Sequence, residues 1–155
     1  MKKWKILLLL GVTGLIIGLV LFWPKDPQKY YIKKYSEKLD VDLNSGKLVS
    51  YQDDHGGFQG DGSRFMVIDL SEAGGLKDLG KLQSMPMPDF LAGYVFKQNY
   101  STTLPDIPVP RNGYYFYENK NSGRSEMDFL GPLWNFIFAV YDADTKLLYI
   151  GECDI

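Results

Sequence analysis

A dense polar cluster lies between residues 53 and 62, with the sequence DDHGGFQGDG. It contains three carboxylates, Asp53, Asp54 and Asp61, and the only histidine of the chain, His55. A histidine beside aspartates can bind a divalent metal, can work as an oriented acid–base pair, or can hydrogen-bond within its own loop and keep the loop in shape. The residue types alone leave these three interpretations open.

The same cluster has four glycines in ten residues, which is more than a hairpin needs. Glycine is used where the backbone takes a positive φ or must approach another group closely, so this loop has either an unusual path or a ligand. We therefore predict a ligand-binding site that comprises Asp53, Asp54, His55, Gly56, Gly57 and Asp61. If a divalent metal is the cofactor, its ligands come from His55, Asp54 and Asp61.

A metal site needs further ligands from elsewhere in the fold, and the spacing does not choose among Glu118, Glu126, Asp128 and Glu152. No catalytic residue is predicted. The chain has one histidine, one cysteine and no G-x-S-x-G nucleophile motif, although His-Gly-Gly is similar to an oxyanion-hole strand of esterases. These residues favour a binding function over an enzymatic one.

The segment DDHGGFQGDG resembles the D-x-HGGFHGDG signature of a family of small, uncharacterised proteins from Gram-positive bacteria that are often membrane-anchored. The resemblance implies a membrane anchor and carries no established activity. The chain departs from the signature at Gln59, where the family pattern has a second histidine. Glutamine is a poor metal ligand, so a metal site with two histidines is disfavoured.

An apolar run without charges extends over 18 residues, from Ile6 to Trp23. This length is enough for a helix to cross a bilayer, and lysines precede the run. No small-residue cleavage site follows it. We therefore expect an uncleaved single-pass signal anchor with the C-terminal domain outside the cytoplasm, and as partners the membrane and a protein of the cell envelope.

The whole chain has 155 residues, of which 45% are hydrophobic and 23% are charged, and its formal net charge is -2. Composition of this kind predicts one globular domain, and the negative charge argues against nucleic acid as a partner. We expect three parts: a membrane anchor at 1–23, a juxtamembrane helix within 24–42, and an α+β domain at 43–155.

Periodicity predicts the elements of the fold. Apolar residues recur at helical spacing in 28–39, with Tyr31 or Ile32, Tyr35 and Leu39 on one face, and a second, shorter helix is expected at 89–98. Strands are expected at 47–52, 64–70, 113–118, 133–141 and 146–154. The predicted fold class is α+β, with an N-terminal transmembrane helix followed by a mainly antiparallel sheet of about five strands with helices on one side.

The sequence thus leads to one functional hypothesis and one alternative. The first is a membrane-tethered, non-enzymatic envelope protein that displays the Gly-rich acidic loop for partner or ligand binding. The alternative is a metal-dependent enzyme or a metal-binding sensor that uses His55 and the neighbouring aspartates.

Overall fold

The structure is a computed structural model that describes residues 27–56, 62–97, 106–120 and 135–154. The chain divides into two compact units, residues 1–31 and 32–155. Within the first unit, the described residues form the start of a helix, where the rings of Tyr30 and Tyr31 meet edge to face with their centroids 5.0 Å apart.

Helix α2 extends from Pro27 to Leu39. Proline is favoured at the start of a helix because it has no N–H to leave unsatisfied. In the second unit, the side chains of Ile32, Tyr35 and Leu39 are buried, as the helical spacing predicts. The helix ends at Leu39 because the next residue, Asp40, has a φ of 58°, and the N–H of Val41 donates to the carbonyl of Ser36 at 3.1 Å.

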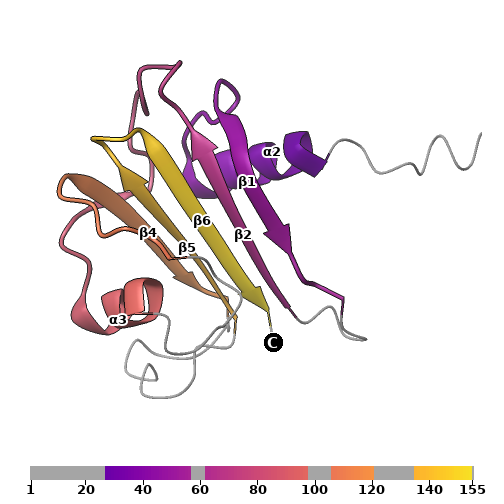
Figure 1. Cartoon of the computed structure of the whole chain (residues 1–155), viewed down its shortest axis with the longest axis vertical. Helices are drawn as coiled ribbons and strands as arrows, with labels where there is room; N and C mark the ends of the chain where they lie inside the picture. Colours follow the sequence, from indigo (N-terminus) through magenta and orange to yellow (C-terminus); the bar gives the residue numbers. More distant parts are fainter. Residues whose placement is uncertain (1–26, 57–61, 98–105, 121–134, 155) are drawn as a thin grey trace, which may run out of the picture. The chain divides into compact units, whose positions relative to one another are not determined.

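The second unit is built on one six-stranded sheet in the order β1-β2-β6-β5-β4-β3, and every neighbouring pair is antiparallel. Figure 1 shows β6 and β5 in the interior of this sheet. The elements are β1 (Lys47–Asp53), β2 (Gly62–Asp69), β3 (Gln83–Ser84), α3 (Asp89–Lys97), β4 (Gly113–Asn119), β5 (Phe136–Asp142) and β6 (Leu147–Asp154).

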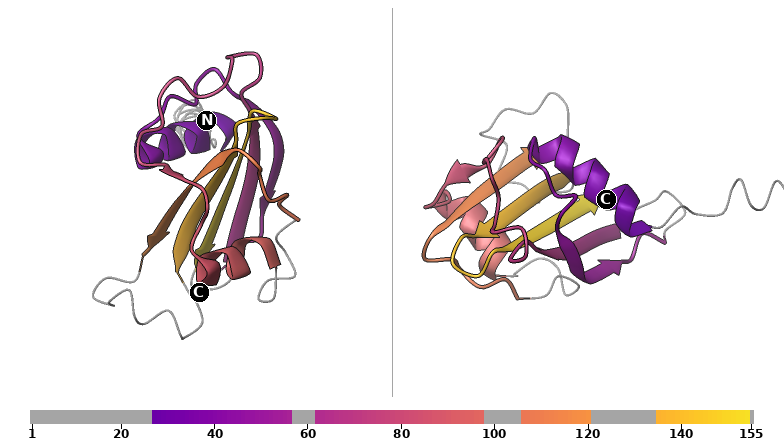
Figure 2. Two further views of the ribbon diagram at one scale, coloured as in Figure 1. Left: turned by 90° about the vertical axis from the view of Figure 1, so that its left-hand side faces the viewer. Right: turned by 90° about the horizontal axis from the view of Figure 1, so that it is seen from above.

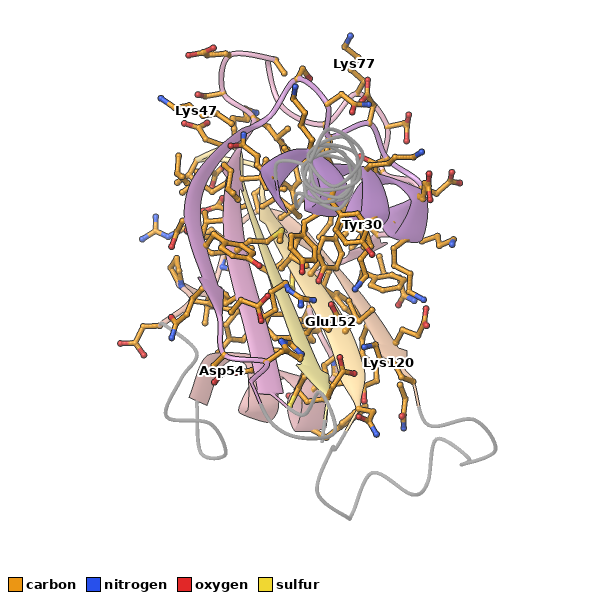
Figure 3. All side chains as sticks on the ribbon, turned by 90° about the vertical axis from the view of Figure 1, so that its right-hand side faces the viewer. Tyr30, Lys47, Asp54, Lys77, Lys120 and Glu152 are labelled. Carbon is orange, nitrogen blue, oxygen red and sulfur yellow. The ribbon has the colours of Figure 1, made fainter. Side chains whose placement is uncertain are left out.

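Both faces of this sheet are covered. Leu91 and Val95 of α3 pack on one face, in a core cluster with Phe65, Phe138 and Tyr149. On the other face, residues 32–39 of α2 cover the alternate side chains of the same strands, such as Met66, Ile68 and Ile150. In Figure 3 α2 lies in front of the sheet and α3 behind it, and the left panel of Figure 2 shows α3 in front.

This architecture corrects two parts of the predicted fold class. The helices lie on opposite faces of the sheet, and not on one side. The sheet has six strands because the two-residue β3 pairs with β4 through Gln83 and Ser84. A strand of two residues is too short to give a period-2 pattern, so sequence periodicity does not reveal it.

The expected membrane anchor is also corrected. Within residues 27–56, 62–97, 106–120 and 135–154, no helix is both long enough and apolar enough to cross a membrane. The predictions of a transmembrane helix, a single-pass signal anchor and an extracytoplasmic domain are therefore wrong for the part that the structure describes. The run Ile6–Trp23, on which they depended, lies outside the described residues.

Candidate functional site

A row of charged side chains crosses the α2-covered face of the sheet. In the strand register, Asp53 of β1 lies opposite Arg64 of β2, and Arg64 lies opposite Glu152 of β6. The row continues through Ile137 of β5 to Glu118 of β4. Directly opposed residues of an antiparallel pair point to the same face, so this register alone brings charges from four strands into one line.

Glu152 is the centre of this row, and its side chain is only 2% exposed. Its carboxylate accepts hydrogen bonds from Lys34 Nζ at 2.7 Å, Tyr35 OH at 2.6 Å and Arg64 Nη1 at 2.8 Å. Lys120 Nζ, which follows β4, lies 2.5 Å from its other oxygen. Figure 3 shows Glu152 and Lys120 close together on this face. The buried carboxylate is thus surrounded by three cations and a phenol.

These contacts decide the protonation of Glu152. Burial by itself would raise the pKa of this carboxyl, but the hydrogen bonds from Lys120, Lys34 and Tyr35 outweigh burial and lower the pKa to about 2. Burial and the hydrogen bond to Glu152 raise the pKa of Tyr35 well above its usual range. Glu152 is therefore ionised, and Tyr35 is a neutral hydrogen-bond donor, at any pH near neutrality.

The predicted residues Asp53 and His55 lie at the β1 end of the same row. Asp53 accepts from Arg64 Nε at 3.0 Å, from Tyr51 OH at 2.7 Å and from the backbone N–H of His55 at 3.1 Å. Burial would raise the pKa of Asp53, but the bonds from Tyr51, His55 and Arg64 hold it well below its usual range. Asp53 is therefore a permanent anion that fixes the position of Arg64.

The imidazole of His55 lies between two carboxylates. Its Nδ1 is 2.6 Å from Asp53 Oδ1, and its Nε2 is 3.4 Å from Asp154 Oδ2. Among the described residues Nε2 makes no hydrogen bond, because the approach to Asp154 has ionic range without hydrogen-bond geometry. Asp154 also binds Lys120 at 2.5 Å, so His55 is linked to Glu152 through Asp154 and Lys120.

Some of the other predicted loop residues belong to the described part of the chain and some do not. Asp54 closes the β1–β2 connection, because its carboxylate accepts from the backbone N–H and the hydroxyl of Ser63, and its own N–H donates to the Ser63 carbonyl at 3.0 Å. Gly56 follows this turn, whereas Gly57 and Asp61 lie outside the described residues. The described contacts of Asp53, Asp54 and His55 are all within the chain, and their role in ligand binding stays a prediction.

An open pocket of about 470 Å³ adjoins Glu152 on this face. Four ammonium groups line it, from Lys34 and Lys38 of α2, from Lys81, and from Lys120. Glu37 and Glu152 are its only lining carboxylates among the described residues. The pocket lining thus carries a net charge of about +2 in a chain whose net charge is -2.

Two of the lining lysines, Lys38 and Lys81, each make one described polar contact with their Nζ. Lys38 pairs with Glu118, which lies outside the pocket lining, and Lys81 Nζ donates to the carbonyl of Lys38 at 3.1 Å. An ammonium has three donors, so each of these lysines has donors left for a ligand. For Lys120, burial would lower the pKa, but its bonds to Asp154 and Glu152 raise it, so its positive charge persists above neutral pH.

The described residues give little support to a metal centre. Among them, no group of three or more His, Cys, Asp or Glu side chains is arranged to bind a metal ion. Of the four additional ligands considered from the sequence, Glu118 and Glu152 bind lysines or an arginine, and Glu126 and Asp128 lie outside the described residues.

Sequence reasoning missed the cations of this site. Lys34, Lys38, Arg64 and Lys120 received no role in the sequence analysis. One signal was available: Arg64 and Glu152 each interrupt an apolar strand, and both lie on the α2-covered face when the strands pair.

The sequence matches no protein-family model, and no curated protein and no solved structure is similar to it.

Proposed function

We propose that this chain is a non-catalytic binding domain and that the lysine-lined pocket beside Glu152 binds an oxyanion group, a phosphate or a carboxylate, of its ligand. The observation that carries the proposal is the convergence of Lys34, Lys38, Lys81 and Lys120 on one open pocket. Lysine is a compact point charge that pairs readily with phosphate and carboxylate oxygens.

The pocket is preorganised for this role by the buried row of charges. Glu152 holds Lys34 and Lys120 in place, and Arg64, which lies outside the pocket lining, shares the charge of Glu152 with them. Rigid positioning of the ligand-binding cations reduces the entropy that binding would otherwise cost. Two described nucleophile types are poorly activated: the hydroxyl of Ser63 donates to Asp54, and burial, with the nearby charges of Asp154 and Asp54, raises the pKa of the Cys153 thiol.

The test is thermal unfolding of the full chain in increasing inorganic phosphate, phenyl phosphate or succinate, at constant ionic strength. A ligand present at a hundred times its Kd stabilises by about 2.7 kcal/mol, which raises the Tm of a chain of this size by about 8 °C. We expect a saturable rise of this order for at least one of the three oxyanions.

The decisive variant is Lys81→Gln. Lys81 has no carboxylate within ion-pair distance among the described residues, so its removal leaves no buried acid unpaired. We expect Lys81→Gln to weaken oxyanion binding at least about tenfold. Lys77→Gln is the matched control, because Lys77 is an exposed lysine outside the pocket lining and far from Lys120 (Figure 3). An equal response of wild type and both variants, or no response to any of the three compounds, would refute the proposal.

A further inference from the structure

A second hollow lies on the opposite side of the sheet, beside α3. This groove has a volume of about 510 Å³ and is lined by Met85 and Met87, by Phe96 of α3, and by Val109. Two charged residues, Asp89 and Arg111, also line it. It shares no lining residue with the lysine-lined pocket.

The sequence of α3 indicates that this helix is covered on more than one side. Every residue from Phe90 to Phe96 is apolar, aromatic or glycine. Leu91 and Val95 account for the face that packs on the sheet, where they are 2% and 3% exposed. Ala92 and Phe96 line the groove and are partly buried against the same core cluster. A helix that is apolar all round is typical of a buried helix, so we expect another surface to pack on the side of α3 that lines the groove.

The same surface carries an apolar projection next to the hollow. Val109 is 67% exposed, which makes it the most exposed of the large apolar side chains in the described part of the chain. Phe90, at the start of α3, is 44% exposed. Exposed large apolar side chains beside a hollow are typical of interaction surfaces in folded proteins.

The charges at the groove are complementary to each other. Asp89 is the first residue of α3, and Arg111 precedes β4 by two residues. Within the described residues neither forms an ion pair, although both line the groove. A surface with one unpaired carboxylate, one unpaired guanidinium, a hollow and an apolar projection is complementary to a second copy of itself.

We propose that this groove is the interface of a symmetric dimer, in which Val109 of one protomer enters the groove of its partner and Asp89 faces the partner's Arg111. In a two-fold interface each such contact occurs twice, so one substitution per chain changes two contacts. A foreign ligand would need complementary charges supplied from elsewhere, whereas a second copy already has both.

The experiment is a charge exchange followed by sedimentation equilibrium of the full chain. Asp89→Lys and Arg111→Glu each place like charges opposite one another in the dimer, and each should raise the dimer Kd at least about tenfold. The double variant exchanges the two charges and should return the Kd to within about threefold of wild type. Val109→Ser removes the projection without changing charge, and it should also weaken the dimer.

Controls separate this interface from other modes of association. Glu72→Lys reverses an exposed charge in the segment after β2, at the other end of the sheet from α3 (Figure 1), and it should leave the Kd unchanged. Far-UV circular dichroism of every variant shows that the fold is retained. A wild-type chain that stays monomeric at millimolar concentration overturns the proposal, as does association that is insensitive to the single variants or not restored in the double variant.

Discussion

Replacing Glu152 with glutamine tests whether the buried row of charges stabilises the fold. The substitution keeps the size of the side chain and removes the charge that Lys34, Arg64 and Lys120 share. The pKa of Glu152 is lowered from its ordinary 4.5 to about 2, which corresponds to about 3 kcal/mol of stability at neutral pH. We therefore expect Glu152→Gln to lower the free energy of unfolding by about 3 kcal/mol at pH 7.

The pH dependence follows from the direction of this pKa change. The folded-state pKa lies below the unfolded-state value, so the stabilisation is fully present above about pH 4.5 and is lost as the pH falls toward about 2. The variant has no such group at this position. The difference in unfolding free energy between wild type and Glu152→Gln should consequently shrink as the pH falls through this window.

Urea denaturation followed by far-UV circular dichroism, repeated from neutral pH into this acid range, measures that difference. Glu118→Gln is the matched control, since Glu118 belongs to the same row and pairs with Lys38 but is 39% exposed. We expect Glu118→Gln to cost about 1 kcal/mol or less. A loss for Glu152→Gln no larger than for Glu118→Gln, or a difference that stays constant with pH, would show that the reasoning is incorrect.

Three further predictions concern single sites. Asp53→Asn should lower the free energy of unfolding by about 1–3 kcal/mol at pH 7. The loss should be smaller in acid, because the pKa of Asp53 lies well below its usual range, and urea denaturation at both pH values measures it. Gly80→Ala should destabilise the fold, because the φ of Gly80 is 48° and a Cβ would meet the backbone oxygens of Leu39 and Asp40. Gly93→Ala in α3 should stabilise the fold by up to about 1 kcal/mol, because a Cβ there meets nothing within 4 Å. Thermal unfolding of the two variants compares them. Cys153 should react with iodoacetamide more slowly than a free thiol at pH 8, since burial and neighbouring carboxylates raise its pKa, and an equal rate would contradict this.

The helix that packs on the sheet could be predicted from the sequence because its pattern is local. Ile32, Tyr35 and Leu39 recur at helical spacing, and all three are buried. The closing hairpin was equally local, with turn residues between two apolar runs. By contrast, β1 does not show the alternating burial of a half-buried strand, since its residues Val49 and Tyr51 are 51% and 38% exposed. A register shift between Leu48 and Ser50 interrupts the alternation of β1, and periodicity cannot reveal a bulge.

The candidate site was harder to predict because it depends on the layers of the fold. The sequence analysis placed the helices on one side of the sheet, so the burial of a second face was not expected. In the structure α2 covers the other face of β6. Glu152 lies on that face with Leu148 and Ile150, and all three side chains are buried. Which helix covers which face is decided by tertiary packing, and no local pattern in α2 or α3 specifies it.

The buried row has a consequence for how the strands pair. Side chains alternate between faces along a strand, so a slip of one residue between β2 and β6 would turn Arg64 or Glu152 toward the α3 side, where Phe65, Phe138 and Tyr149 form an apolar core. An ionised carboxylate without its partners in such a core costs several kcal/mol. Because both faces of the sheet are buried and carry similar apolar side chains, apolar burial alone would discriminate only weakly between alternative strand registers. The single charged pair between two central strands therefore specifies the register, in addition to any stability that it supplies.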